Sequence, residues 1–195
     1  MKVALVSMPW CDFGMPSAAL GALSAYIRTR MPHIGLACHS EHLEIYRRLG
    51  ADAYLIFRNN RVLGEDLYLS TLFPEYRAAV KGAFVERAVA GEGETPGTVE
   101  FGRCWEEVFE SVRDRLLEHR DAAAQALADG ADVVGLTTSL AQTFSSLSLA
   151  RRIREISPDV RIVLGGAAVE GMRARAVLTE FPFVDYVIEG EGEIV

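Results

Sequence analysis

Apolar residues in this chain form short continuous runs, separated by stretches in which apolar residues recur at helical spacing. The continuous runs are Lys2–Ser7, Ile34–Cys38, Asp132–Thr137, Arg161–Leu164 and Tyr186–Glu189. Continuous hydrophobicity with many β-branched residues is typical of strands that are buried on both faces. Helical spacing is found between the runs, at Ala18–Arg28, Leu147–Ile156 and Glu170–Phe181.

The alternation of strand and helix patterns predicts an α/β fold, because strand–helix–strand units build parallel sheets. Pro32, Pro158 and Pro182 each follow a predicted helix and mark its end. At 195 residues the chain favours one domain, residues 1–195. The sequence therefore predicts a doubly wound, flavodoxin-like (Rossmann-type) domain with a five-stranded parallel sheet.

A long segment between the second and third predicted strands interrupts this alternation. Residues 41–121 are largely helical in pattern, with apolar residues at i, i+3 and i+4 in Leu43–Leu49, Phe73–Ala90 and, running past the segment, Trp105–Ala128. A polar, glycine-rich loop is predicted at Ala90–Gly97, and the apolar run Ala53–Phe57 indicates a short strand. We interpret residues 41–121 as a helical insertion.

Composition excludes several classes of function. Half of the residues are apolar and the net charge is −7, which disfavours nucleic acid as a partner because phosphate binding needs clustered Lys and Arg. The chain has no continuous apolar run of about 18 residues, so no membrane span is expected. Cys11, Cys38 and Cys104 form no C-x-x-C pair, which indicates neither a disulfide framework nor a zinc ribbon. These features favour a cytoplasmic protein.

Several common catalytic patterns are missing. The sequence has no G-x-G-x-x-G after the first strand, no G-x-x-x-x-G-K-[ST] and no G-x-S-x-G. Cys11 has no histidine partner in the pattern, so cysteine catalysis is not expected. His39 and His42 are three residues apart, but no third ligand stands nearby. We expect surface or hydrogen-bonded histidines rather than a metal site.

Small and polar residues follow the third, fourth and fifth predicted strands, at Thr137–Ser139, Gly165–Gly166 and Gly190–Glu193. In open α/β sheets, ligands bind at the carboxyl ends of the strands. Each glycine pair also has a plain explanation as a tight turn, and Ser139 is also suited to cap the next helix. Gln142 has no such structural explanation, and it is therefore the better candidate for contact with a ligand.

Taken together, these motifs resemble the amino-terminal cobalamin-binding domain of cobalamin-dependent radical SAM enzymes, in particular the subgroup that matures ribosomally made peptide natural products. The resemblance is carried by Val3–Trp10, Asp132–Ser139, Gln142, Leu149–Ile153, Val163–Ala167 and Val184–Glu193.

The resemblance implies that cobalamin lies across the carboxyl edge of the sheet. The corrin would rest over the loops after the first and third strands, and the nucleotide tail would lie beside the fourth and fifth. The cofactor-binding residues that it implies are Met8, Pro9, Thr138, Ser139, Gln142, Gly165, Gly166, Ala167, Gly190 and Glu191. The motif D-x-H-x-x-G is absent, so no histidine is expected as the lower ligand of the cobalt.

The resemblance also implies a reaction that this chain alone lacks the residues to perform. Radical SAM chemistry needs C-x-x-x-C-x-x-C to bind a [4Fe–4S] cluster, and no such motif is present. In the family it follows the turn that matches Gly190–Glu193, so a radical SAM domain that uses S-adenosylmethionine is expected downstream. The full-length protein would be a C-methyltransferase acting on a precursor peptide, whereas this chain would bind cobalamin without catalysis.

Two alternatives remain open from the sequence. The chain can be a free-standing cobalamin carrier or sensor, or a flavodoxin-like domain for another ligand. A signalling receiver would need acidic residues after the first strand and an aspartate after the third. The chain instead has Ser7-Met8 and Thr137-Thr138 at these positions, which disfavours a receiver.

Overall fold

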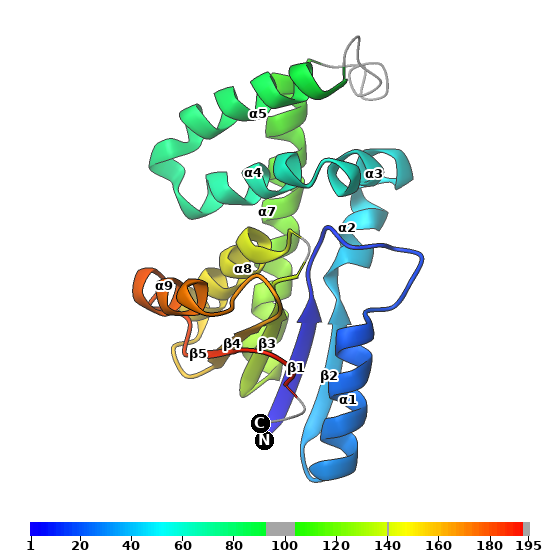
Figure 1. Cartoon of the computed structure of the whole chain (residues 1–195), viewed down its shortest axis with the longest axis vertical. Helices are drawn as coiled ribbons and strands as arrows, with labels where there is room; N and C mark the ends of the chain where they lie inside the picture. The colour runs from blue at the N-terminus through cyan, green and yellow to red at the C-terminus, as the bar shows by residue number, and fades with distance from the viewer. Residues whose placement is uncertain (93–103, 140, 193–195) are drawn as a thin grey trace.

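The computed structural model describes residues 1–92, 104–139 and 141–192. Five parallel strands form one sheet in the order β2-β1-β3-β4-β5, which confirms the flavodoxin-like α/β fold (Figure 1). The strands are β1 (Lys2–Ser7), β2 (Gly35–Ser40), β3 (Val133–Thr137), β4 (Arg161–Gly165) and β5 (Tyr186–Ile188). The order in which successive strands are added to the sheet reverses between β1 and β3. Ligands bind near this point in such sheets.

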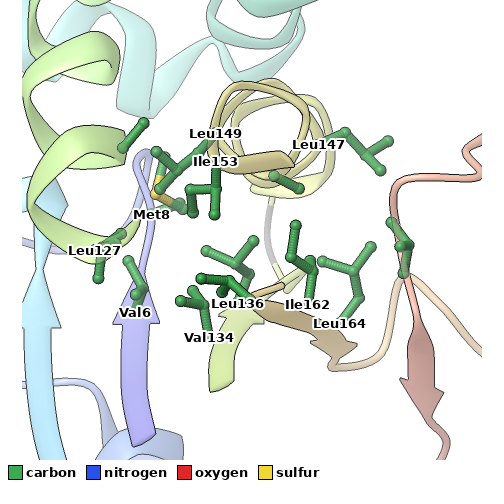
Figure 2. Close-up of a cluster of buried hydrophobic side chains, with 14 of the residues drawn as sticks. Val6, Met8, Leu127, Val134, Leu136, Leu147, Leu149, Ile153, Ile162 and Leu164 are labelled. Carbon is green, nitrogen blue, oxygen red and sulfur yellow. The ribbon is translucent and has the colours of Figure 1, made fainter. Parts of the chain in front are cut away.

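Three helices cover one face of the sheet. They are α7 (Trp105–Gly130), α8 (Thr143–Ile156) and α9 (Met172–Glu180). Figure 2 shows the side chains of α8 directed at those of β3 and β4, with Leu149 and Ile153 above Val134 and Ile162. Each of these four side chains is completely buried, and burial of each contributes about 1.5–3 kcal/mol relative to exposure. This packing fixes the positions at which β3 and β4 end.

Helix α1 (Ala18–Arg30) packs against β1 and β2. It lies on the opposite face because β1-α1-β2 and β3-α8-β4 run in opposite directions across the sheet and both crossovers are right-handed. Ser17 caps the amino terminus of α1 by accepting a hydrogen bond from the Leu20 amide at 3.3 Å. Tyr186 and Ile188 of β5 are largely exposed.

The predicted insertion is helical throughout the part that the structure describes. Its elements are α2 (Glu41–Leu49), α3 (Ala51–Asn59), α4 (Arg61–Leu72), the 3-10 helix η1 (Pro74–Tyr76) and α5 (Arg77–Glu92). These elements and the amino-terminal half of α7 are called the helical unit below. Figure 1 shows the helical unit beyond the carboxyl ends of β1 and β2. The predicted loop at Ala90–Gly97 lies largely outside the described residues, and α5 continues through its first residues to Glu92.

The short strand predicted at Ala53–Phe57 is wrong, because this segment is the middle of α3. Tyr54 and Phe57, three residues apart, are both fully buried, which places them on one face of a helix. A strand would have buried alternate residues instead. The apolar run was too short for its periodicity to separate the two structures.

The helical unit has a hydrophobic core of its own, distinct from the core between the sheet and α8. Its fully buried aromatic side chains include Tyr54, Phe57, Phe84 and Phe109. Trp10, from the loop after β1, lies in the same cluster, with its ring centroid 5.1 Å from that of Phe57 and 5.2 Å from that of Tyr54. The helical unit is therefore built around a residue of the sheet's carboxyl edge.

Candidate functional site

Of the ten residues proposed from the sequence, Gly165 is the last residue of β4 and the other nine lie in the loops that follow β1, β3, β4 and β5. Because all five strands are parallel, these loops meet at one edge of the sheet. The structure therefore brings the residues to one rim. The rim has two different halves, one over β3, β4 and β5 and one over β1.

The ends of β3 and β4 are joined by close backbone contact. Thr138 donates two hydrogen bonds to the Gly165 carbonyl, from its amide at 2.9 Å and from its hydroxyl at 3.0 Å. Gly166 has a φ of 120°, which favours glycine, and a Cβ there would stand 2.7 Å from Ser139 Oγ. Gly166 is therefore required for the approach of the two loops. This requirement is separate from any contact with a ligand.

The rim over β4 and β5 contains glycines that leave backbone without a side chain. A Cβ on Gly165 would make only ordinary contact with β5, 3.8 Å from the Ile188 carbonyl oxygen. Gly190 has a φ of 74° and open space where a side chain would stand. Ala167, Gly190 and Glu191 are exposed. This half of the rim can accept a broad, flat group.

The half of the rim over β1 is buried. Met8 and Pro9 are both buried, and their carbonyls are already bonded. Gln142 Nε2 donates to the Met8 carbonyl, and Ser145 Oγ donates to the Pro9 carbonyl at 3.1 Å. Contact between cobalamin and Met8 or Pro9 therefore stays a prediction.

Gln142 has a structural role that the sequence did not reveal. It is buried, it precedes the first residue of α8, and its amide ties the start of that helix to the loop after β1. The argument that it lacks a structural explanation is therefore wrong. Ser139 does not cap α8, because the N-cap position belongs to Gln142. Thr138 instead holds the loop against Gly165 through its hydrogen bonds, and Ser139 lies beside Gly166.

Two residues that the sequence analysis did not select decide the shape of this half. Trp10 is fully buried and fills the space beside Gly64 of α4, where a Cβ would stand 2.1 Å from its indole nitrogen. Glu65, the next residue of α4, accepts a hydrogen bond from the Phe144 amide at 3.1 Å. A glycine followed by an acidic residue within a helical pattern was the available signal, but it does not show which segment packs there.

Glu65 is the most perturbed carboxyl at the rim. Burial raises its pKa to about 7, the nearby charge of Asp66 adds to this, and the Phe144 amide partly offsets it. Its Oε1 is buried without a hydrogen-bond partner among the described residues. An unpaired buried carboxylate oxygen is costly, which is why the protonated form is favoured.

One cysteine, Cys11, lies in the loop after β1, at the rim. Cys11 is half-buried, and burial raises its pKa above the ordinary value. Its Sγ lies 3.7 Å from Ser7 Oγ and 3.6 Å from the Met8 carbonyl oxygen. The neighbouring residues anchor the same loop to α3, since Tyr54 donates to the Cys11 carbonyl at 2.8 Å and Arg58 to Asp12 at 2.7 Å.

Three of the four histidines, His39, His42 and His119, lie near the carboxyl ends of β1 and β2, and two of them are buried. His119 of α7 pairs with Glu41 of α2 at 2.7 Å, and both side chains are almost fully buried. His39 Nδ1 lies 3.8 Å from the same carboxylate. His42 is buried, which lowers its pKa. Within the described ranges, no three His, Cys, Asp or Glu side chains are arranged to hold a metal ion.

The B12-binding domain family model matches residues 85–195, which is more than half of the chain. The chain belongs to the B12-binding domain family. Comparison with curated proteins and with solved structures gave no match. In the described part of this B12-binding chain, no helix is both long enough and apolar enough to cross a membrane.

Membership of the B12-binding family supports cobalamin as the ligand, and the rim fits it in part. The matched residues 85–195 include β3, β4 and β5 with their loops. The bare backbone at Gly165 and Gly190 suits a broad corrin and its tail, because no side chain has to move aside. Over β1 the backbone is not bare in this way, because Met8 and Pro9 are buried and their carbonyls accept hydrogen bonds from Gln142 and Ser145.

Proposed function

We propose that this chain binds cobalamin at the rim over β3, β4 and β5, as the amino-terminal part of a radical SAM enzyme. In the proposed full-length protein, cobalamin supplies the methyl group and a downstream radical SAM domain cleaves S-adenosylmethionine at a [4Fe–4S] cluster. The substrate is a ribosomally made precursor peptide, and the reaction is C-methylation. The chain itself contributes cofactor binding.

The observation that carries the proposal is the gathering of Gly165, Gly166, Ala167 and Gly190 at one exposed rim of a B12-binding fold. These residues give a floor of backbone at the carboxyl edge of the sheet, where ligands bind in open α/β folds. The contacts proposed for Ser139, Thr138 and Glu191 follow from their position beside this floor. The radical SAM and peptide parts of the proposal rest on the sequence resemblance.

Cobalamin retention tests the first part directly. The chain is mixed with hydroxocobalamin, excess ligand is removed by gel filtration, and the visible spectrum of the protein peak is recorded. We expect a retained corrin band without the features of histidine ligation, since D-x-H-x-x-G is absent. A protein peak without corrin absorbance contradicts the proposal.

A bulky substitution at the rim tests the placement. Ala167→Trp adds a large side chain at an exposed position next to Gly166 and is expected to abolish retention. Ala126→Trp is the matched control, because Ala126 of α7 is exposed at the opposite, amino edge of the sheet beside Lys2 and Gly35. Equal retention by both variants would show that cobalamin binds elsewhere.

The enzymatic part is tested on the full-length protein after iron–sulfur reconstitution. Formation of 5′-deoxyadenosine and of a methylated precursor peptide is the expected result. Retention of cobalamin without cleavage of S-adenosylmethionine would favour the alternative, a cobalamin carrier or sensor.

A further inference from the structure

Glu65 of the helical unit contacts the start of α8. Glu65 lies on α4, and it accepts a hydrogen bond from the backbone amide of Phe144, in the first turn of α8. Gln142, which precedes the first residue of α8, holds the loop after β1. The start of α8 is therefore fixed from two sides, by a side chain of its own and by a side chain of the helical unit.

No other side-chain cap is present at this helix terminus in the described part of the chain. The side chain of Gln142 makes no capping bond, and the first turn of α8 contains no acidic residue. Free amides at a helix start need an acceptor, and a carboxylate also interacts favourably with the helix dipole. Glu65 supplies this acceptor from a segment 79 residues earlier in the chain.

We propose that Glu65 is a positioning residue through which the helical unit sets the start of α8 and, with it, the strength of cobalamin binding. This inference rests on the proposed cobalamin site. Ser139, just before the start of α8, is a proposed contact, and Gln142 links the same segment to the β1 loop. A shift of the helix start would move both residues relative to the rim.

Protonation of Glu65 is expected to control this contact. Oε1 is buried without a partner, so a negative charge there is unfavourable. Burial raises the pKa of Glu65 to about 7, so the charge forms within the physiological range. Loss of the proton places a buried charge between α4 and the start of α8, and this favours separation of the two helices at that point. The acceptor for Phe144 is present in both forms, and the charged form binds that amide more strongly, but burial outweighs this effect.

Several charged groups on the elements around α4 are bound to other partners. Asp66, the neighbouring residue, pairs with Arg87 of α5, and its charge adds to the raised pKa of Glu65. The arginines of α7 and α8 are held elsewhere, Arg113 by Ser70, Arg120 by Asp121 and Arg151 by the Leu72 carbonyl. Tyr68 is fully buried, and burial raises the pKa of its hydroxyl so that it stays neutral.

Cyanocobalamin affinity at pH 6 and pH 8 tests the proposal, with far-UV circular dichroism to show that each variant is folded. Wild type is expected to bind about fivefold more weakly at pH 8, the size of effect that loss of a helix cap produces. Glu65→Gln keeps an acceptor oxygen and cannot ionise, so it should bind like wild type at pH 6 and show no change with pH. Glu65→Ala should bind about fivefold more weakly at both pH values.

Glu155→Gln is the control, because it removes one negative charge from an exposed position of α8, away from the helix start. It should keep the pH dependence of wild type. The inference is overturned if Glu65→Gln keeps that dependence too, or if Glu65→Ala binds as tightly as wild type. If wild type binds no cobalamin, the proposed function fails, and hydrogen exchange at the first turn of α8 still decides the role of Glu65. Exchange there should be faster in Glu65→Ala than in Glu65→Gln. Equal exchange rates would refute the positioning role of Glu65.

Discussion

The indole of Trp10 lies against the bare backbone of Gly64. A Cβ on Gly64 would stand 2.1 Å from the indole nitrogen and 2.4 Å from Cδ1, distances that no packing tolerates. Trp10 belongs to the loop after β1 and Gly64 to α4, so this contact joins the sheet to the helical unit. It explains a glycine in the middle of a helix, where the residue is otherwise unfavourable.

Gly64→Ala is therefore expected to destabilise the protein by about 2–3 kcal/mol, the effect of overpacking a full core. The control is Gly82→Ala in α5, where the position is exposed and no atom lies within 4 Å of the new Cβ. That change should stabilise by up to about 1 kcal/mol through helix propensity. Urea denaturation of both variants measures the two free energies of unfolding, and equal values would contradict the Trp10 contact.

Gly166 and Gly190 are expected to respond differently to alanine. Both residues have positive φ, so alanine at either position introduces backbone strain that costs on the order of 1 kcal/mol. Only Gly166 also meets a neighbour, Ser139 Oγ at 2.7 Å, whereas the space beside Gly190 is open. Gly166→Ala should thus lower the melting temperature more than Gly190→Ala. The order would be reversed if Gly190 were the position that packs against another loop.

The stability of the wild-type protein should fall as pH rises from about 4.5 to about 7, through the contribution of Glu65. Its folded-state pKa is raised above the ordinary 4.5, so in this range the folded state binds more protons than the unfolded state. The full effect is at most about 3 kcal/mol. Glu65→Gln should flatten this part of the profile of free energy of unfolding against pH, and an unchanged slope would assign the effect to another group.

Breaking the pair between Glu41 and His119 is expected to lower the free energy of unfolding. Both side chains are almost fully buried, so His119→Ala leaves a buried carboxylate with His39 at 3.8 Å as its remaining partner. We expect destabilisation of about 3 kcal/mol. His33→Ala, at an exposed position, should change the free energy of unfolding by less than about 0.5 kcal/mol. Chemical denaturation compares the two variants, and a small effect at His119 would contradict the burial of the pair.

The strands and the helices between them followed from the sequence because each has a local periodic signal. The continuous apolar runs became β1 to β5 within one or two residues, and the helical patterns became α1, α8 and α9. The strand ends then fixed which loops share an edge, since parallel strands end on the same side. The sequence alone therefore places Gly165, Gly166, Ala167 and Gly190 at one rim.

Tertiary structure decided the rest, because it depends on contacts between distant segments. Local pattern does not show that Trp10 enters the core of the helical unit, that Gly64 makes room for it, or that Glu65 caps a helix 79 residues later in the chain. Gln142 was assigned to a ligand for the same reason, since its partner, the Met8 carbonyl, is 134 residues away. The sequence determined the sheet and its glycine-rich edge. The packing of the helical unit determined which part of that edge stays open, because burial is settled only when both surfaces meet.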